Sequence, residues 1–345
     1  MRCFLFILVF TLLSDLRAEK IVQCVTYSPI DAEWYTQALQ ERGYEGRVVA
    51  TNIKEYEASL LKRSGFFHRL LRRWSLDYPW SVPLAPEVDK VVFFNVKPSV
   101  CKKYDLSRFP REKLVLFMWE PPTVLPKMYK TRLQGYFPKI YTWDDTLVDE
   151  IRYFKFHYPV WTPAILEEIP FEEKKLCTLI SSDIKGHGKH ELYSARKEAI
   201  RYFENVKEEG FEFYGRRWDK AQYPSYRGIV EDKLETMKRY RFCICYENTK
   251  EISGYITEKI FDCFAALTVP IYWGASNVEA SIPKGCFVDR RDFANLEELH
   301  AFMKGMSKET HEGYLGRIKA FLKSDAVQPF TSAALAQTFY EAVTQ

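Results

Sequence analysis

The sequence has 345 residues, of which 47% are hydrophobic and 16% aromatic, and this supplies enough apolar material for two cores. Its formal net charge of +4 is small for that length, which argues against a nucleic-acid partner. The eight cysteines are scattered, with no pair at metal-binding spacing. We therefore expect core thiols rather than a disulfide scaffold or a zinc site.

Residues 1–20 have the pattern of a targeting segment. Met1 and Arg2 precede an apolar run from Cys3 to Leu13. This run is shorter than the ~20 residues that span a bilayer and matches a signal-peptide core. We expect membrane association or entry into a secretory pathway. The alternative is a cytoplasmic protein with peripheral membrane contact; the absence of any Asn-x-Ser/Thr sequon weakly disfavours a eukaryotic lumenal glycoprotein.

The first half alternates strand-like runs with helical or irregular segments. The runs are residues 21–27, 47–50, 90–95, 114–119 and 139–142. This order predicts a doubly wound α/β domain over residues 21–165, followed by an acidic linker near residues 163–175. Phe66 to Trp74 has a basic and an apolar face. An ordinary packed helix is the preferred interpretation, with contact to a membrane or a lipid-linked acceptor as the alternative.

Glu120 follows the apolar strand that ends at Trp119 and precedes Pro121 and Pro122. Ligands of α/β sheets bind at the carboxyl ends of parallel strands. A carboxylate so placed is partly desolvated, so its pKa should rise and it could accept a proton from a hydroxyl group. The alternative is a structural glutamate paired with a basic neighbour.

Two further polar clusters have competing interpretations. Asp144 and Asp145 follow the strand at 139–142 and suggest either a metal–nucleotide site or, preferably, a cap for the next helix. His187 and His190 lie in a basic, glycine-rich loop. This loop fits contact with phosphate or solvent better than metal binding.

Residues 240–274 form the most informative stretch of the chain. A β-favouring run from Arg241 to Tyr246 ends at Glu247 and Asn248, and a polar loop then reaches Gly254. Thr257 can cap a helix whose apolar residues recur every three or four positions, and Pro270 begins another extended run. This is a β-loop-α-β unit of a parallel sheet.

The first turn of that predicted helix carries Glu258 and Lys259. A cation there opposes the helix dipole by ~0.3–1 kcal/mol, and an anionic ligand would resolve the conflict because helix N-termini bind phosphate. Glu258 is not a capping-box partner, since that position is Ile260. Its side chain is available to sugar hydroxyls, although dipole stabilisation alone would also account for it.

The ordered set of motifs resembles the α-1,3-fucosyltransferases of glycosyltransferase family 10, of bacterial type. The resemblance covers Glu247-Asn-Thr249, Tyr255-Ile-Thr-Glu-Lys259, Val269-Pro-Ile-Tyr-Trp-Gly274 and Ile282-Pro-Lys-Gly-Cys-Phe-Val-Asp289. Upstream, Tyr193-Ser-Ala-Arg196 with Phe213-Tyr-Gly215 is similar to the family's phosphate-contacting arginine segment and its following strand. The loop after Asn248 is one residue longer than in Lewis-type members.

The resemblance implies a GT-B fold, in which two Rossmann-like doubly wound domains face each other across a cleft. It implies an acceptor-side domain over residues 21–165, a GDP-fucose-binding domain over residues 174–325 and a C-terminal helix over 326–345. The activity implied is inverting transfer of L-fucose from GDP-fucose to a hydroxyl of an oligosaccharide or glycan acceptor, with no tightly bound cofactor or metal.

Site roles follow from the same resemblance. Glu120 takes the place of the family's general base, in a motif where Pro121 replaces serine. The donor-binding residues implied are Arg196, Glu247, Asn248, Tyr255, Glu258 and Lys259. Two alternatives stay open: a transferase of the same fold that uses another nucleotide sugar, and a non-catalytic glycan-binding protein.

Overall fold

The structure is a computed structural model that describes residues 20–26, 39–50, 88–160 and 165–345. The predicted targeting segment, apart from Lys20, and the stretch from Phe66 to Trp74 lie outside these residues. Internal contacts divide the chain into two compact units. The first contains the described residues up to Met118 together with Lys130–Tyr141 and Ala336–Gln345; the second contains Trp119–Tyr129 and Thr142–Leu335.

The first sheet confirms the five strands expected in the first half of the chain. In the order β2-β1-β3-β4-β5-β6, its strands are β1 Lys20–Thr26, β2 Tyr44–Ala50, β3 Lys90–Phe94, β4 Leu114–Met118, β5 Lys139–Thr142 and β6 Tyr153–Lys155. β1 pairs in parallel with β2 and β3, and β3 pairs in parallel with β4. The short β6 was not predicted, because three residues show no alternation.

All residues of β4 are buried, as a central parallel strand requires. Phe117 on this strand stacks on Tyr141 of β5 at 4.6 Å and on Phe94 of β3 at 5.3 Å between ring centroids. The helices in this part of the chain are α5 Pro98–Tyr104 and α6 Thr131–Gln134, with 3-10 helices η1 Leu106–Arg108, η2 Arg111–Lys113 and η3 Pro126–Tyr129.

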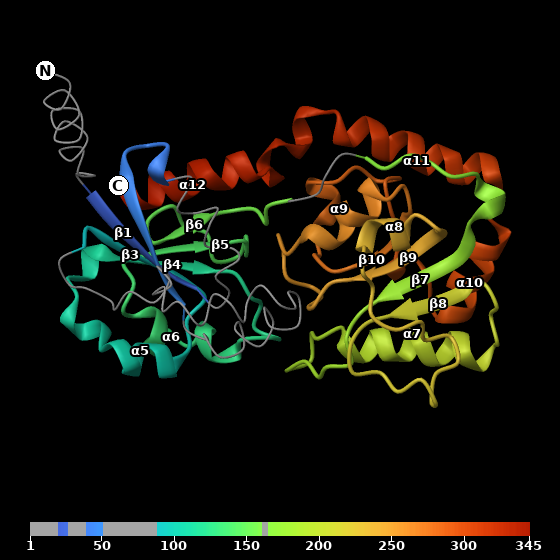
Figure 1. The fold of residues 1–345 in the computed structure, drawn as a ribbon, viewed down its shortest axis with the longest axis horizontal. Coiled ribbons are helices and arrows are strands. Elements are labelled where there is room, and N and C mark those ends of the chain that lie inside the picture. The colour runs from blue at the N-terminus through green and yellow to red at the C-terminus, as the bar shows by residue number, and fades with distance from the viewer. Residues whose placement is uncertain (1–19, 27–38, 51–87, 161–164) are drawn as a thin grey trace, which may run out of the picture. The chain divides into compact units, whose positions relative to one another are not determined.

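The second sheet is parallel, with the order β11-β10-β9-β7-β8. Its strands are β7 Lys175–Ile180, β8 Phe211–Tyr214, β9 Tyr240–Tyr246, β10 Val269–Trp273 and β11 Val288–Asp289. Helix α7 (Tyr193–Asn205) lies on one face, while α8 (Lys233–Met237) and α9 (Glu258–Ala265) lie on the other (Figure 1). This is the doubly wound arrangement that the sequence predicts.

The strand order reverses direction between β7 and β9, because the chain proceeds from β7 outward to β8 and then returns to the other side of β7. Crevices at such a switch point, outside the carboxyl ends of the strands, are where doubly wound sheets bind ligands. Two segments of the second unit end there: β7 at Ile180 and β9 at Tyr246.

Helix α9 begins as predicted. Thr257 is its N-cap, and the hydroxyl accepts a hydrogen bond from the Lys259 amide at 3.4 Å. Ile260, Phe261 and Phe264 are buried against the sheet and the neighbouring helices. The helix ends at Ala265, and Leu267 follows with a positive φ of 49° before β10 begins.

The remaining helices complete the chain. They are α10 Leu296–Gly305, α11 Lys308–Leu322 and α12 Ser332–Thr344, with 3-10 helices η4 Phe171–Glu173, η5 Val278–Ala280, η6 Arg290–Asp292 and η7 Asp325–Phe330. The C-terminal helix predicted over residues 326–345 is therefore a 3-10 helix followed by α12, because Pro329 interrupts the α-helical pattern.

The contact units differ from the predicted domain ranges in one respect that matters for the site. Trp119–Tyr129, expected in the first domain, belongs to the second unit, and so does everything from Thr142 to Leu335. Glu120 is thus in the same unit as the motifs after residue 174. The sequence pattern marks where β4 ends, but not where the loop after it packs.

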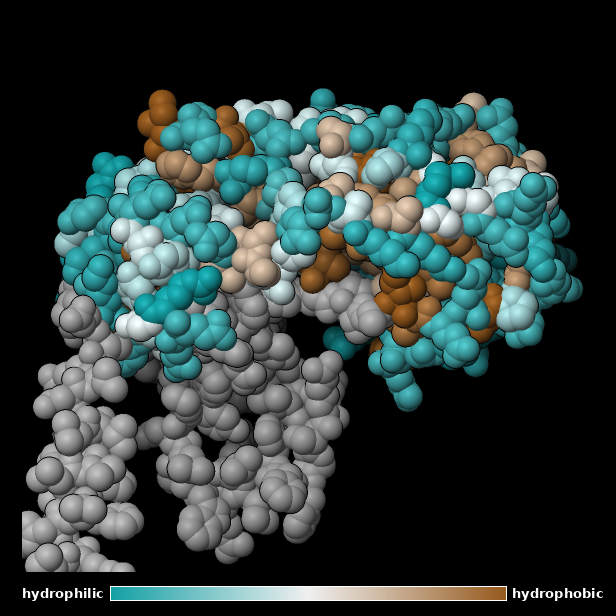
Figure 2. Space-filling model, turned by 90° about the horizontal axis from the view of Figure 1, so that it is seen from above, coloured by the Kyte–Doolittle hydropathy of each residue, from teal (hydrophilic) through white to brown (hydrophobic). Residues whose placement is uncertain are grey.

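No helix among the described residues is long and apolar enough to cross a membrane. The face shown in Figure 2 is mostly hydrophilic, with apolar side chains in small separated groups. The large apolar side chains with most exposure, Ile151, Val206, Ile229 and Phe302, come from different parts of the chain. Singly exposed apolar residues of this kind are normal for a folded protein.

Candidate active site

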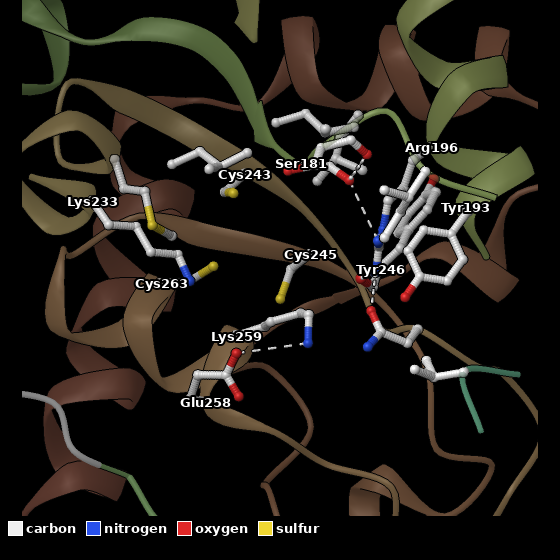
Figure 3. A pocket seen from close by; sticks show the side chains of 18 of the residues that line it. Ser181, Tyr193, Arg196, Lys233, Cys243, Cys245, Tyr246, Glu258, Lys259 and Cys263 are labelled. Atoms are coloured by element: carbon white, nitrogen blue, oxygen red, sulfur yellow. Dashed lines mark hydrogen bonds and ion pairs between the residues drawn. The ribbon is translucent and has the colours of Figure 1, made fainter. Parts of the chain in front are cut away.

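A cavity of about 410 Å³ lies at the switch point of the second sheet, and all of its lining residues belong to the second unit. Five of the seven predicted site residues line it: Glu120, Arg196, Asn248, Glu258 and Lys259. Ser181 and Ser182 follow β7, Asn248 follows β9, and Lys259 starts α9. The fold therefore gathers residues from separate segments of the second unit around one space (Figure 3).

Arg196 is held rigidly at one side of this cavity. It lies in the first turn of α7 and is 7% exposed. Nη2 donates to the Tyr246 carbonyl at 2.6 Å and to Asn248 Oδ1 at 3.1 Å, and the guanidinium lies over the Tyr193 ring at 4.8 Å. Burial lowers the pKa of the guanidinium. Its orientation is fixed by three partners before any ligand binds.

The bond between Arg196 and Asn248 also settles where the loop after β9 runs. Asn248 lines the cavity. Further along this loop, the Lys250 amide donates to the His190 carbonyl at 2.9 Å and Glu251 adopts a positive φ of 65°.

Lys259 extends into the cavity, with a side chain that is 25% exposed. Its ammonium lies 3.1 Å from Glu247 Oε2, 3.0 Å from Thr257 Oγ1 and 3.7 Å from Glu258 Oε1. Burial lowers its pKa, but the carboxylates of Glu247 and Glu258 outweigh burial and hold the pKa above the usual lysine value. A counter-ion from the protein therefore already offsets the unfavourable dipole position.

Glu258 faces the same cavity from the start of α9, with 41% of its side chain exposed. Burial acts to raise its pKa, but the ammonium groups of Lys259 and Lys233 hold it below the usual range. Glu258 is thus an ionised acceptor beside two cations, which suits hydrogen bonds from ligand hydroxyls.

Glu120 shows the opposite behaviour. Burial raises the pKa of its carboxyl group, the Lys259 ammonium opposes this, and the Glu258 carboxylate adds to it. The predicted direction is confirmed. The Tyr129 hydroxyl donates to the Glu120 carbonyl at 2.9 Å and fixes the loop that carries it. A carboxyl group with a raised pKa is a better proton acceptor once ionised.

Two of the predicted donor-binding residues are not among the residues that line this cavity. Glu247 is fully buried behind Lys259. Tyr255 is 1% exposed, and its ring packs at 4.4 Å from Trp143 and 5.8 Å from Tyr158. Both side chains are buried outside the cavity lining, which motif position alone does not reveal.

Asp144 and Asp145 do not cap a helix as predicted, because no helix follows them in this part of the chain. Asp144 Oδ1 accepts from the Thr146 amide at 3.0 Å in a local turn. Asp145 forms an ion pair with Lys155 at 2.5 Å and accepts from Asn277 at 2.9 Å. Burial raises the pKa of Asp145, but these two partners together lower it.

Neither His187 nor His190 lines the cavity. The His187 amide donates to the Thr123 carbonyl at 2.9 Å, and the His190 carbonyl accepts from the Lys250 amide. The described residues contain no group of three or more His, Cys, Asp or Glu side chains that could hold a metal ion. The loop connects neighbouring backbone segments, which its sequence did not indicate.

Several lining residues were not identified from the sequence. Lys233 forms an ion pair with Asp262 at 2.5 Å and lies opposite Arg196 across the cavity (Figure 3). Cys243, Cys245 and Cys263 are buried, as predicted for core thiols, and also contribute to the wall. The alternation of Cys243 and Cys245 on a strand that leads into the motif is the signal that could have placed them together.

Residues 172–316 match the family model described as glycosyltransferase family 10 (fucosyltransferase) C-term. This part of the chain is therefore similar to the C-terminal domain of glycosyltransferase family 10. Among curated relatives, an alpha-(1,3)-fucosyltransferase of Helicobacter pylori is 40% identical over 75 residues, which is 22% of this chain and 16% of the relative. The human 4-galactosyl-N-acetylglucosaminide 3-alpha-L-fucosyltransferase 9 is 25% identical over 206 residues, or 59% of this chain and 51% of that protein.

These curated relatives are matched over about half of their length or less. Solved structures extend the likeness of the fold to most of the chain. An alpha1,3-fucosyltransferase crystallised with GDP-fucose has a TM-score of 0.51 at 16% identity, covering 94% of this chain and 91% of that one. A phage T4 glucosyltransferase with UDP-glucose has a TM-score of 0.55 at 12% identity, covering 94% and 100%. The α/β, GT-B fold class is confirmed.

Proposed function

We propose that the protein is an inverting glycosyltransferase that moves L-fucose from GDP-fucose to a hydroxyl of an acceptor glycan. One observation carries this proposal: a single cavity at the switch point of a family 10 domain holds Arg196 and Lys259 together with Glu120 and Glu258. Two cations suit a diphosphate, while the two carboxyl groups differ in the direction of their pKa shifts and so suit different tasks.

The donor end is built for a nucleoside diphosphate. Arg196 and Lys259 provide charged donors for the phosphate oxygens, and Asn248 holds the Arg196 guanidinium in place at 3.1 Å. Ionised Glu258 accepts hydrogen bonds from ribose hydroxyls. The cavity volume of about 410 Å³ lies within the range of ordinary small-molecule pockets, about 300–1,000 Å³.

The proposed chemistry is one displacement at the anomeric carbon. The acceptor oxygen attacks from the face opposite GDP, the bond between that carbon and the diphosphate oxygen breaks, and Glu120 takes the hydroxyl proton. The bonding pair leaves with GDP, where Arg196 and Lys259 neutralise the growing charge. The raised pKa of Glu120 matches a base that must hold the proton as it transfers.

We also propose that no tightly bound cofactor or metal takes part, since Arg196 and Lys259 supply the charge that a metal supplies in other designs. The test is transfer activity in excess EDTA against activity with added Mg²⁺ or Mn²⁺. Unchanged activity is expected. Complete loss that a metal restores would instead favour the alternative assigned to Asp144 and Asp145.

Two rival functions are tested by one ligand panel. The solved structure with UDP-glucose shares the fold, so a different nucleotide sugar is the nearer rival; a non-catalytic glycan-binding protein is the other. Thermal unfolding with GDP, UDP, GDP-fucose and GDP-mannose should show the largest rise in Tm with the guanine nucleotides. Transfer of labelled fucose on a glycan array then tests catalysis and identifies the acceptor; failure with every GDP-sugar would support the non-catalytic rival.

The place of action is proposed from the sequence of residues 1–20. Their apolar run suggests membrane association or secretory targeting, and the basic and apolar faces of the segment from Phe66 to Trp74 suggest peripheral contact as the alternative. Fractionation of cells that express the full chain, with and without residues 1–20, distinguishes the two. Membrane recovery that survives the truncation would assign the contact to another segment.

A further inference from the structure

We propose that Glu247 is a positioning residue: its buried carboxylate holds the ammonium group of Lys259 in the cavity and does not itself touch the donor. The inference deepens the proposed function and rests on it for the identity of the ligand. It assigns to Glu247 a role different from the direct donor contact implied by the family resemblance.

The carboxylate of Glu247 is buried, and both of its oxygens accept hydrogen bonds. The side chain is 0% exposed, at the end of β9 where the parallel strand meets the start of α9. Oε1 accepts from the Thr257 amide at 2.8 Å, Oε2 accepts from Lys259 Nζ at 3.1 Å, and both oxygens lie within 2.9 Å of the Thr257 hydroxyl. A buried carboxylate requires such partners, and these leave it directed at α9 rather than at the cavity.

The backbone around Glu247 leaves it little freedom to move. Its amide donates to the Trp273 carbonyl at 2.8 Å, which ties it to the end of β10. Gly274 lies so close that a Cβ atom there would be 2.6 Å from Glu247 Cγ. The glycine at the end of β10 therefore permits the close approach that places the carboxylate under the first turn of α9.

The charged groups around Lys259 explain how a lysine is accommodated in the first turn of a helix. Lys259 faces like charges from Arg196 of α7 and Lys233 of α8. It faces Glu258 on its own helix and, more distantly, Glu120 and Tyr193. The Glu247 carboxylate lies 3.1 Å from Lys259 Nζ and is buried, while the Glu258 carboxylate lies 3.7 Å away and is partly exposed. Loss of the Glu247 charge therefore removes the least screened attraction that keeps Lys259 protonated and in place.

A substitution that removes the charge of Glu247 should change the titration of Lys259 directly. It should change ligand binding only through Lys259. In Glu247→Gln the amide keeps the shape and can still accept from the Thr257 amide, but it no longer neutralises the ammonium. The titration of Lys259 should move to lower pH, because burial and the neighbouring cations then prevail. GDP affinity should fall about tenfold near neutral pH and further as the pH rises through the lowered pKa.

The experiment has a ligand-free and a ligand-dependent readout. Lysine labelled with ¹³C at Cε reports the titration of Lys259 by NMR, with the signal assigned from a Lys259→Arg sample, and calorimetry gives GDP affinity across the same pH range. Glu247→Asp keeps the charge but withdraws it by one methylene, and should show both effects at smaller size. It also carries the test if Glu247→Gln does not fold.

Glu212→Gln is the matched control. Glu212 is a 7% exposed carboxylate that pairs with Arg227 at 2.7 Å and Lys175 at 2.8 Å, and it does not line the cavity. This variant should lose stability but keep both the Lys259 titration and GDP affinity. Reduced GDP affinity in Glu247→Gln with an unchanged Lys259 titration would overturn the proposal and return Glu247 to direct donor contact. If wild-type protein binds no GDP, the proposed function fails, while the NMR titration still tests whether Glu247 controls Lys259.

Discussion

Two glutamates follow the ends of apolar parallel strands, and the surroundings of their carboxyl groups differ. Glu120 follows β4, and burial raises the pKa of its carboxyl group in a loop with two prolines. Glu247 follows β9, where the Thr257 amide, the Thr257 hydroxyl and the Lys259 ammonium surround its carboxylate. The two carboxyl groups thus differ in their surroundings: burial dominates at Glu120, whereas hydrogen-bond donors enclose Glu247.

The largest effect is expected when Glu120 is substituted. Glu120→Gln keeps the size and shape of the side chain but cannot accept the proton, so kcat should fall by ~10²–10⁴-fold. GDP affinity should not fall, since the substitution removes a negative charge from a cavity that binds an anion. Steady-state kinetics and calorimetry separate the two quantities.

Glu251→Gln is the control for this change, because Glu251 is a 55% exposed carboxylate that does not line the cavity. It should leave kcat unchanged. If Glu120→Gln keeps more than about a tenth of wild-type turnover, Glu120 is structural. Asp144 and Asp145 would then be the next carboxylates to test.

The second largest effect is expected for the two cations of the cavity, Lys259 and Arg196. Lys259→Ala and Arg196→Ala should each weaken GDP binding and slow transfer by about 10²-fold, because charge-assisted contacts to phosphate also stabilise the leaving group. Arg196→Lys should recover little, since it loses the guanidinium whose Nη2 donates to both the Tyr246 carbonyl and Asn248. Lys284→Ala, at a 75% exposed lysine, serves as control. Wild-type GDP affinity in either alanine variant contradicts the donor assignment.

Local patterns in the sequence were enough to predict β1 to β5 of the first sheet, β9 and β10 of the second, and the start of α9. Thr257 caps that helix, and the spacing of Ile260, Phe261 and Phe264 creates the face it buries. These features depend on residues close in sequence, so their pattern carries the information. Glu258 and Lys259 are neighbours in the first turn of α9, whereas Arg196 on α7 was assigned from the family resemblance, and the tertiary fold brings it to the same cavity.

What the sequence did not reveal depends on long-range packing. Tyr255 was assigned to the pocket but packs against Trp143, more than a hundred residues earlier. Asp145 was expected to cap a helix but meets Lys155 and Asn277. Lys233 lies beside Asp262 and lines the cavity, although no sequence motif identifies it. Each outcome depends on which segments the tertiary fold brings together, which periodicity does not encode.

The pH dependence of catalysis is a further test of the difference between Glu120 and Glu247. In the proposed mechanism the ionised form of Glu120 is the base. Its pKa is raised, so activity should fall as the pH drops through a value above the ordinary glutamate range. On the acid side kcat/KM should decline by about tenfold per pH unit. This limb should vanish in Glu120→Gln and persist in Glu212→Gln. A limb at the usual glutamate pKa would contradict the desolvated environment of Glu120.

The smallest expected effect separates acid loss of the fold from acid loss of the base. His311 on α11 is 1% exposed, and burial lowers its pKa from 6.5 to about 4. Between these values the unfolded chain binds the proton and the folded protein does not. Stability from this group is therefore complete above pH 6.5 and declines as the pH falls toward 4, by about 3 kcal/mol in full.

Urea unfolding at a series of pH values measures this decline, with His311→Gln as the variant. Glutamine can still donate to the Arg241 carbonyl, which His311 Nε2 meets at 3.2 Å, but it does not titrate. The variant should be less stable near neutral pH and lose less stability on acidification. His157, whose pKa burial also lowers to about 4, is present in both proteins, so the difference between them isolates His311. Parallel pH profiles for the two proteins would show that His311 titrates normally in the folded state, and the acid limb of catalysis would then need no correction for it.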